Sequence, residues 1–68
     1  MLFTLTTDFG AGSGYPAQMK GVLLSAVPGA AVVDVSHEVP RHDVLAGALL
    51  REACLPWFPR EAIHLGVV

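Results

Sequence analysis

The sequence has a single cysteine, Cys54. One cysteine cannot form an intrachain disulfide, which excludes a small secreted scaffold held together by disulfides. Its apolar neighbours, Leu55 and Trp57 among them, predict that the thiol is buried and structural. The cysteine count is therefore compatible with a reducing compartment.

Basic residues and long apolar runs are also lacking. Four lysines and arginines stand against six aspartates and glutamates, for a net charge of −2, and no basic cluster is present to bind phosphates. No apolar run reaches the ~20 residues that cross a membrane, and the N-terminus has no basic region typical of a signal peptide. We therefore expect a cytoplasmic protein with neither a nucleic-acid nor a membrane partner.

Apolar residues, by contrast, are abundant for so short a chain. The 68 residues are 53% hydrophobic and only 15% charged. Since a domain of about 60 residues buries only ~60% of the surface that its unfolded chain exposes, we expect part of this apolar surface to contact more chain or another subunit. The last apolar run, residues 62–68, has no polar tail, and it predicts that residues 1–68 are an N-terminal fragment of a larger α/β domain.

Apolar periodicity and turn signals predict five alternating elements. They are a strand at 2–6, a helix at 15–27, a strand at 31–35, a helix at 44–55 and a strand at 62–68. Connections of this length imply parallel strands joined by right-handed crossovers, and near-continuous apolar strands indicate burial by helices on both faces. The predicted fold class is α/β, a β-α-β-α-β parallel sheet flanked by helices.

The first helix has the clearest start and stop signals. Ser13 or Gly14 is the expected N-cap, and Pro16 fits the first turn because its missing N–H costs nothing there. The dipeptide at 28–29, Pro-Gly, ends the helix. The residues expected on its buried face are Met19, Val22, Leu23 and Ala26.

A carboxylate, Asp8, follows the first strand and precedes a glycine-rich loop. Open α/β sheets bind ligands beyond the carboxyl ends of their strands, so Asp8 is placed to accept hydrogen bonds from ribose hydroxyls, hold a metal ion or take a proton. The alternative is a local turn in which Asp8 bonds backbone amides two residues on. The spacing of Gly10, Gly12 and Gly14 matches neither a dinucleotide nor a Walker A motif, so a phosphate cradle is weakly supported.

Polar residues also follow the second strand. Ser36, His37 and Glu38 come first, and His42 and Asp43 open the second helix, either of them a candidate cap. Imidazole and carboxylate together can bind zinc, but this spacing matches no established zinc motif. We interpret Ser36, His37 and Glu38 as support for the loop backbone. A relay of Ser36, His37 and Asp8 is geometrically unsupported, because adjacent residues cannot form it.

Several segments together resemble one known family. They are Leu5–Gly10 (LTTDFG), Tyr15 with 19–21 (MKG), 33–40 (VDVSHEVP), and 43–44 with 47–48. The sequence is similar to the N-terminal part of the S-adenosylmethionine hydroxide adenosyltransferases. These are also called adenosine-forming S-adenosylmethionine hydrolases and include the fluorinase and chlorinase enzymes. The match extends over essentially the whole chain.

The resemblance implies an α/β domain followed by a β-rich C-terminal domain, in a homotrimer whose active sites lie between subunits. It implies displacement of methionine from the ribose C5′ of S-adenosylmethionine by water or hydroxide, with no metal or cofactor. It places Asp8 on the ribose hydroxyls, with Phe9, Gly10, Ser13 and His42 as further substrate-binding residues. No catalytic residue of the family falls within residues 1–68, so we expect this fragment alone to be inactive.

Two positions depart from the family pattern. Ser13 replaces a usual second aspartate, which removes a charge facing the cationic substrate, and His42 replaces a usual aromatic residue beside the ligand. Two other functions stay open: a metal-dependent phosphatase-type site on Asp8, which needs a second nearby carboxylate, and a non-catalytic interaction module. The sequence does not decide between water and halide as the nucleophile.

Overall fold

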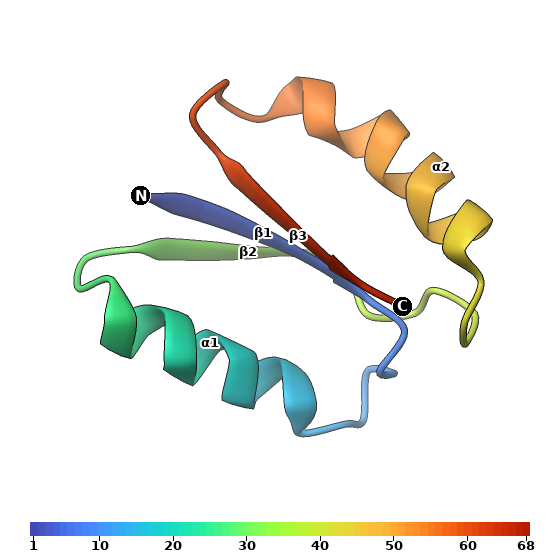
Figure 1. Ribbon diagram of the computed structural model, residues 1–68, viewed down its shortest axis with the longest axis horizontal. Helices are drawn as coiled ribbons and strands as arrows, with labels where there is room; N and C mark the ends of the chain where they lie inside the picture. The colour runs from blue at the N-terminus through green and yellow to red at the C-terminus, as the bar shows by residue number, and fades with distance from the viewer.

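The computed structural model describes residues 1–68 as a three-stranded parallel sheet with one long helix on each side (Figure 1). Its elements are β1 (Leu2–Thr7), α1 (Tyr15–Ala26), β2 (Ala31–Ser36), α2 (Val44–Cys54), the 3₁₀ turn η1 (Leu55–Trp57) and β3 (Ile63–Val67). The strand order is β2-β1-β3. The predicted α/β class and the order of elements are confirmed, and every predicted boundary lies within one residue of the observed one.

The central strand β1 carries most of the core. Its residues 3–7 are all buried, and three of these five are threonines. Thr4 and Thr7 have side-chain hydrogen-bond partners, whereas the hydroxyl of Thr6 has none. The core at the centre of the sheet is therefore partly polar, and not all of its buried hydroxyl groups are hydrogen-bonded.

Two burial predictions are wrong. Val22 is 69% exposed and Ala26 is also exposed, because α1 packs through Pro16, Met19 and Leu23, a stripe rotated away from Val22. Cys54 is half-buried rather than buried, since it lies in the last turn of α2 beside the exposed η1.

Large apolar side chains are exposed on both helices and on η1. The most exposed are Val22, Val44, Leu45 and Trp57, the last at 87%. This agrees with the expectation that part of the apolar surface contacts other protein, which stays a prediction. Neither helix combines the length and the apolar character that a membrane crossing requires.

Candidate functional site

Two loops meet beyond the carboxyl ends of adjacent strands. Residues 8–14 follow β1 and lead to α1, and residues 37–43 follow β2 and lead to α2 on the opposite face of the sheet (Figure 1). In the order β2-β1-β3 the chain reverses its direction across the sheet between β1 and β3, and open α/β sheets usually bind ligands outside the carboxyl ends of their strands at such a switch point. The structure thus brings together both groups of predicted site residues.

Hydrogen bonds tie the two loops to each other. The amide of Gly10 donates to the carbonyl oxygen of His37 (2.8 Å), and the amide of Val39 donates to the carbonyl oxygen of Thr7 (3.3 Å). The Glu38 carboxylate accepts the amide of Ala11 (2.8 Å). Gly10 has a φ of +88°, a conformation that glycine adopts without a Cβ penalty. The site loop is therefore shaped before any ligand binds.

Asp8 lies at the rim of the sheet, half-buried. Its Oδ2 accepts the amide of His42 at 2.8 Å, and its own amide donates to the carbonyl oxygen of Val67 at 3.2 Å. The carboxylate thus bridges to the other loop instead of bonding an amide two residues on. An ionised carboxylate has about four lone-pair sites, so Asp8 keeps acceptor capacity for a ligand while it holds His42.

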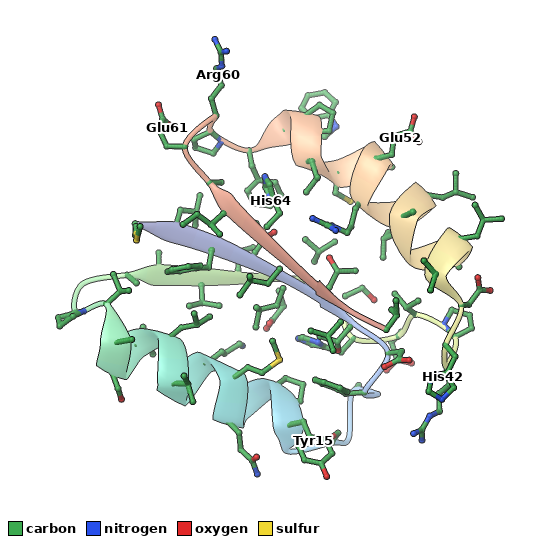
Figure 2. The ribbon with its side chains drawn as sticks, in the orientation of Figure 1. Tyr15, His42, Glu52, Arg60, Glu61 and His64 are labelled. Carbon is green, nitrogen blue, oxygen red and sulfur yellow. The ribbon has the colours of Figure 1, made fainter.

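His42 and Asp43 have different roles at the start of α2. Asp43 is the N-cap, and its Oδ1 accepts the amide of Ala46 at 2.9 Å. His42 has a φ of +61°, which is uncommon for a residue with a Cβ. Its exposed side chain projects outward from the loop (Figure 2). The imidazole is therefore free to contact a ligand.

The start of α1 adds an aromatic pair and a hydroxyl. The rings of Phe9 and Tyr15 lie 5.4 Å apart at 58°. Gly14 is the N-cap and provides no side-chain bond, but the hydroxyl oxygen of Ser13 accepts the amide of Tyr15 at 3.1 Å. At the end of β2, the hydroxyl oxygen of Ser36 accepts the amide of Glu38 at 3.0 Å. Both serines thus stabilise their own turns.

A second set of polar residues lies beneath the loops, and the sequence prediction missed three of its members. Thr7 Oγ1 lies 2.7 Å from His37 Nδ1, His37 Nε2 lies 2.8 Å from Asp34 Oδ1, and Lys20 Nζ donates to Asp34 Oδ2 at 2.6 Å. Thr7, Lys20 and Asp34 were not expected to take part. One signal was present: Asp34 is an acidic residue inside an otherwise apolar, β-branched strand.

The charge of Asp34 is stabilised by its partners. The hydrogen bond from Lys20 is the largest cause, and together with His37 it outweighs partial burial and holds the pKa of the Asp34 carboxyl below its ordinary value. Asp34 is therefore a carboxylate at neutral pH, with both oxygens occupied.

The described residues offer no metal centre. No group of three or more histidine, cysteine, aspartate or glutamate side chains is placed to hold an ion. His37 uses both ring nitrogens in hydrogen bonds, and Oδ2 of Asp8 accepts the amide of His42. The phosphatase-type alternative therefore gains no support from the geometry. His64, in β3, is not part of this site: its Nδ1 lies 2.7 Å from the hydroxyl of Thr4.

Comparison with known proteins gives a consistent result. Residues 3–68 match the family model described as the SAM hydroxide adenosyltransferase N-terminal domain. The chain is 35% identical over 71 residues to an (R)-S-adenosyl-L-methionine hydrolase of Methanocaldococcus jannaschii, covering 98% of this chain and 27% of the relative. It is 42% identical over 65 residues to one of Salinispora tropica, covering 96% of this chain and 24% of the relative.

A solved structure has the same fold as this chain. A crystal structure of a conserved hypothetical protein from Thermus thermophilus superposes with a TM-score of 0.88 at 39% identity, covering 97% of this chain and 28% of that one. The chain thus spans about a quarter of the length of the relatives it matches. The resemblance seen in the sequence is confirmed.

Proposed function

The chain belongs to the SAM hydroxide adenosyltransferase family through its N-terminal domain, and on this premise we propose that it forms the adenosyl-binding part of an S-adenosylmethionine hydrolase. In the proposed reaction, water or hydroxide attacks the ribose C5′ and the C5′–S bond breaks. Methionine leaves with the bonding electrons, adenosine forms, and the attacking water loses a proton. The sulfonium is already a good leaving group, so the proposal includes neither metal nor cofactor.

The observation that carries this proposal is the placement of Asp8. The carboxylate lies at the switch point, is fixed from one side by the His42 amide, and keeps acceptor capacity on the other. Two ribose hydroxyls that donate to one carboxylate have a defined orientation, and a fixed sugar keeps the C5′–S bond in line with the nucleophile. Such orientation lowers the entropic part of the barrier. In this proposal Asp8 is a substrate-binding residue and not a base.

The surrounding residues complete the proposed adenosyl site. Gly10 allows close approach to the backbone, Phe9 contributes apolar surface beside Tyr15, and His42 offers an exposed ring for stacking. Ser13 is a neutral donor where the family usually has an aspartate, so it supplies no attraction for the sulfonium cation.

The remaining parts of the proposal concern the whole protein. We place the water-activating residues outside residues 1–68, in a β-rich C-terminal domain and in the rest of the α/β domain. The exposed apolar side chains of α1, α2 and η1 support burial against further protein, and we propose a cytoplasmic homotrimer.

The test is an Asp8→Asn substitution in the full-length protein. The amide oxygen of asparagine still accepts from His42, so the loop keeps its tether, but the ribose hydroxyls lose a charged acceptor. Hydrogen bonds to charged groups contribute about 1.5–3 kcal/mol, against about 0.5–1.5 kcal/mol for neutral ones. Two such bonds predict an affinity for S-adenosylmethionine that is roughly ten- to a hundredfold lower by calorimetry.

Glu61→Gln is the matched control. It also removes one acidic charge, but Glu61 lies at the opposite end of the sheet from His42 (Figure 2), so affinity should be unchanged. Adenosine and methionine release are followed by chromatography. The proposal fails if the wild-type protein releases neither product, or if Asp8→Asn binds the substrate as tightly as wild type does.

A further inference from the structure

Four side chains form one continuous hydrogen-bonded row from α1 to the end of β1. Lys20 Nζ is 2.6 Å from Asp34 Oδ2, Asp34 Oδ1 is 2.8 Å from His37 Nε2, and His37 Nδ1 is 2.7 Å from Thr7 Oγ1. The row ends where the amide of Phe9 donates to Thr7 Oγ1 at 3.3 Å. We propose that Lys20, Asp34, His37 and Thr7 are positioning residues that set the conformation of the Asp8–Gly10 segment in the adenosyl site.

The chemistry of the row assigns a direction to each bond when the imidazole of His37 carries one proton. Asp34 is a carboxylate and only accepts, so His37 Nε2 carries a proton and donates to it. Thr7 Oγ1 accepts the amide of Phe9 and has one proton to give, and His37 Nδ1 is the acceptor within reach. The tautomer with the proton on Nδ1 alone would set a lone pair of Nε2 against the Asp34 carboxylate. In the neutral ring, the geometry therefore assigns the proton of His37 to Nε2.

Burial excludes a nucleophilic role for this set. A hydroxyl, an imidazole and a carboxylate in a row are the components of a catalytic triad. The side chain of Thr7, however, is completely buried, with 0% exposure, inside the central strand. No substrate reaches its oxygen, so the row holds structure in place and does not attack.

His37 holds the site loop on both sides of Phe9. Its side chain acts through Thr7 on the amide of Phe9, and its carbonyl oxygen accepts the amide of Gly10 at 2.8 Å. Asp8 directly precedes these two amides. Rotation of the imidazole would break its bond to Thr7, and Asp34, itself held by Lys20, prevents that rotation. The inference rests on the proposed function, because it assigns the segment's task as substrate binding.

Adjacent threonines in β1 supply a matched test in the full-length protein. Thr7→Val removes a hydroxyl with two partners, and Thr7→Ser restores it. Thr6→Val removes a buried hydroxyl without a partner. We expect Thr7→Val to raise KM for S-adenosylmethionine about tenfold and to lower kcat by a smaller factor. In Thr7→Ser and Thr6→Val, both KM and kcat should stay within about twofold of the wild-type values.

Nuclear magnetic resonance provides a readout that needs no substrate. The ¹⁵N signals of His37 should show a protonated Nε2 and an unprotonated Nδ1, and the Phe9 amide signal should move in Thr7→Val but not in Thr6→Val. If Thr7→Val does not fold, Lys20→Met tests the far end of the row, since Lys20 lies on the surface. Lys20→Met should shift the ¹⁵N signals of His37 and the amide signal of Phe9, and it should raise KM for S-adenosylmethionine about threefold.

The outcomes separate the two proposals. Any of three results would overturn the positioning role. They are a neutral His37 with its proton on Nδ1, a Phe9 amide signal that is unchanged in both Thr7→Val and Lys20→Met, and a wild-type KM in Thr7→Val. If the wild-type protein neither binds nor cleaves S-adenosylmethionine, the proposed function fails, and the signals of His37 and Phe9 still decide whether the row exists.

Discussion

Three glycines allow the backbone shape of the site loop to be tested apart from the space around it. Gly10 and Gly29 have φ values of +88° and +84°, whereas Gly12 has no such conformation. At all three positions an added Cβ would meet no heavy atom within 4 Å. Substitution by alanine therefore changes backbone energetics without steric overlap.

The expected magnitudes follow from two opposing effects. A left-handed conformation costs an alanine about 1–2 kcal/mol, and replacement of glycine lowers the entropy of the unfolded chain, which stabilises by about 0.4–1 kcal/mol. Gly10→Ala and Gly29→Ala should each lower the free energy of unfolding by about 1 kcal/mol. Gly12→Ala requires no left-handed conformation, so it should leave the free energy of unfolding unchanged or raise it by about 0.5 kcal/mol.

Urea unfolding and substrate binding together give the assay. Gly10 donates its amide to the carbonyl oxygen of His37, so Gly10→Ala should also weaken S-adenosylmethionine binding. Gly29 lies in the turn between α1 and β2, at the other end of the sheet (Figure 1), and its substitution should leave affinity unchanged. The reasoning is refuted if Gly10→Ala is as stable as wild type, or if Gly29→Ala weakens binding to the same extent.

Two further predictions concern the charged residues around the sheet. Because the folded-state pKa of Asp34 is lowered, its carboxylate stabilises the fold above its unfolded pKa of about 4, and that contribution is lost as the pH falls through the folded value. Lys20→Met should raise the pKa of Asp34, seen by ¹³C titration of the carboxyl, and should make urea stability less dependent on pH in the acid range. Asp43→Ala removes the cap bond to Ala46 and should lower the free energy of unfolding by about 1 kcal/mol, whereas Asp43→Asn should retain most of it.

The fold was predictable because its signals are local. Apolar runs, Pro-Gly punctuation and short connections define the elements, and handedness rules then leave few arrangements. The buried face of α1 was not predictable in detail: Val22 and Leu23 both fit a helical stripe, and the packing of α1 on the sheet decides that Leu23 is the more buried.

The candidate site was predictable where it follows from topology and not where it depends on register. Asp8 and His37 each come at or just after a strand end, so parallel pairing alone brings them to one edge. The contact of Thr7 with His37 depends on how β1 and β2 align, and that register shifts between Leu5 and Thr6, where an irregularity interrupts the pairing. No sequence pattern marks that shift. The hydrogen-bonded row from Lys20 to Thr7 could therefore not be predicted from the sequence.

Asp8 stabilises the loop before α2, and this structural role is compatible with the ligand-binding role proposed for its carboxylate. His42 adopts a left-handed conformation that costs about 1–2 kcal/mol. A hydrogen bond from its amide to the charged Asp8 contributes about 1.5–3 kcal/mol, which offsets that cost. The same bond limits the rotation of the carboxylate, which in the proposed function accepts from the ribose diol. Asp8→Ala would remove the tether and the ligand acceptor together, and only Asp8→Asn, which keeps an acceptor for His42, separates the two.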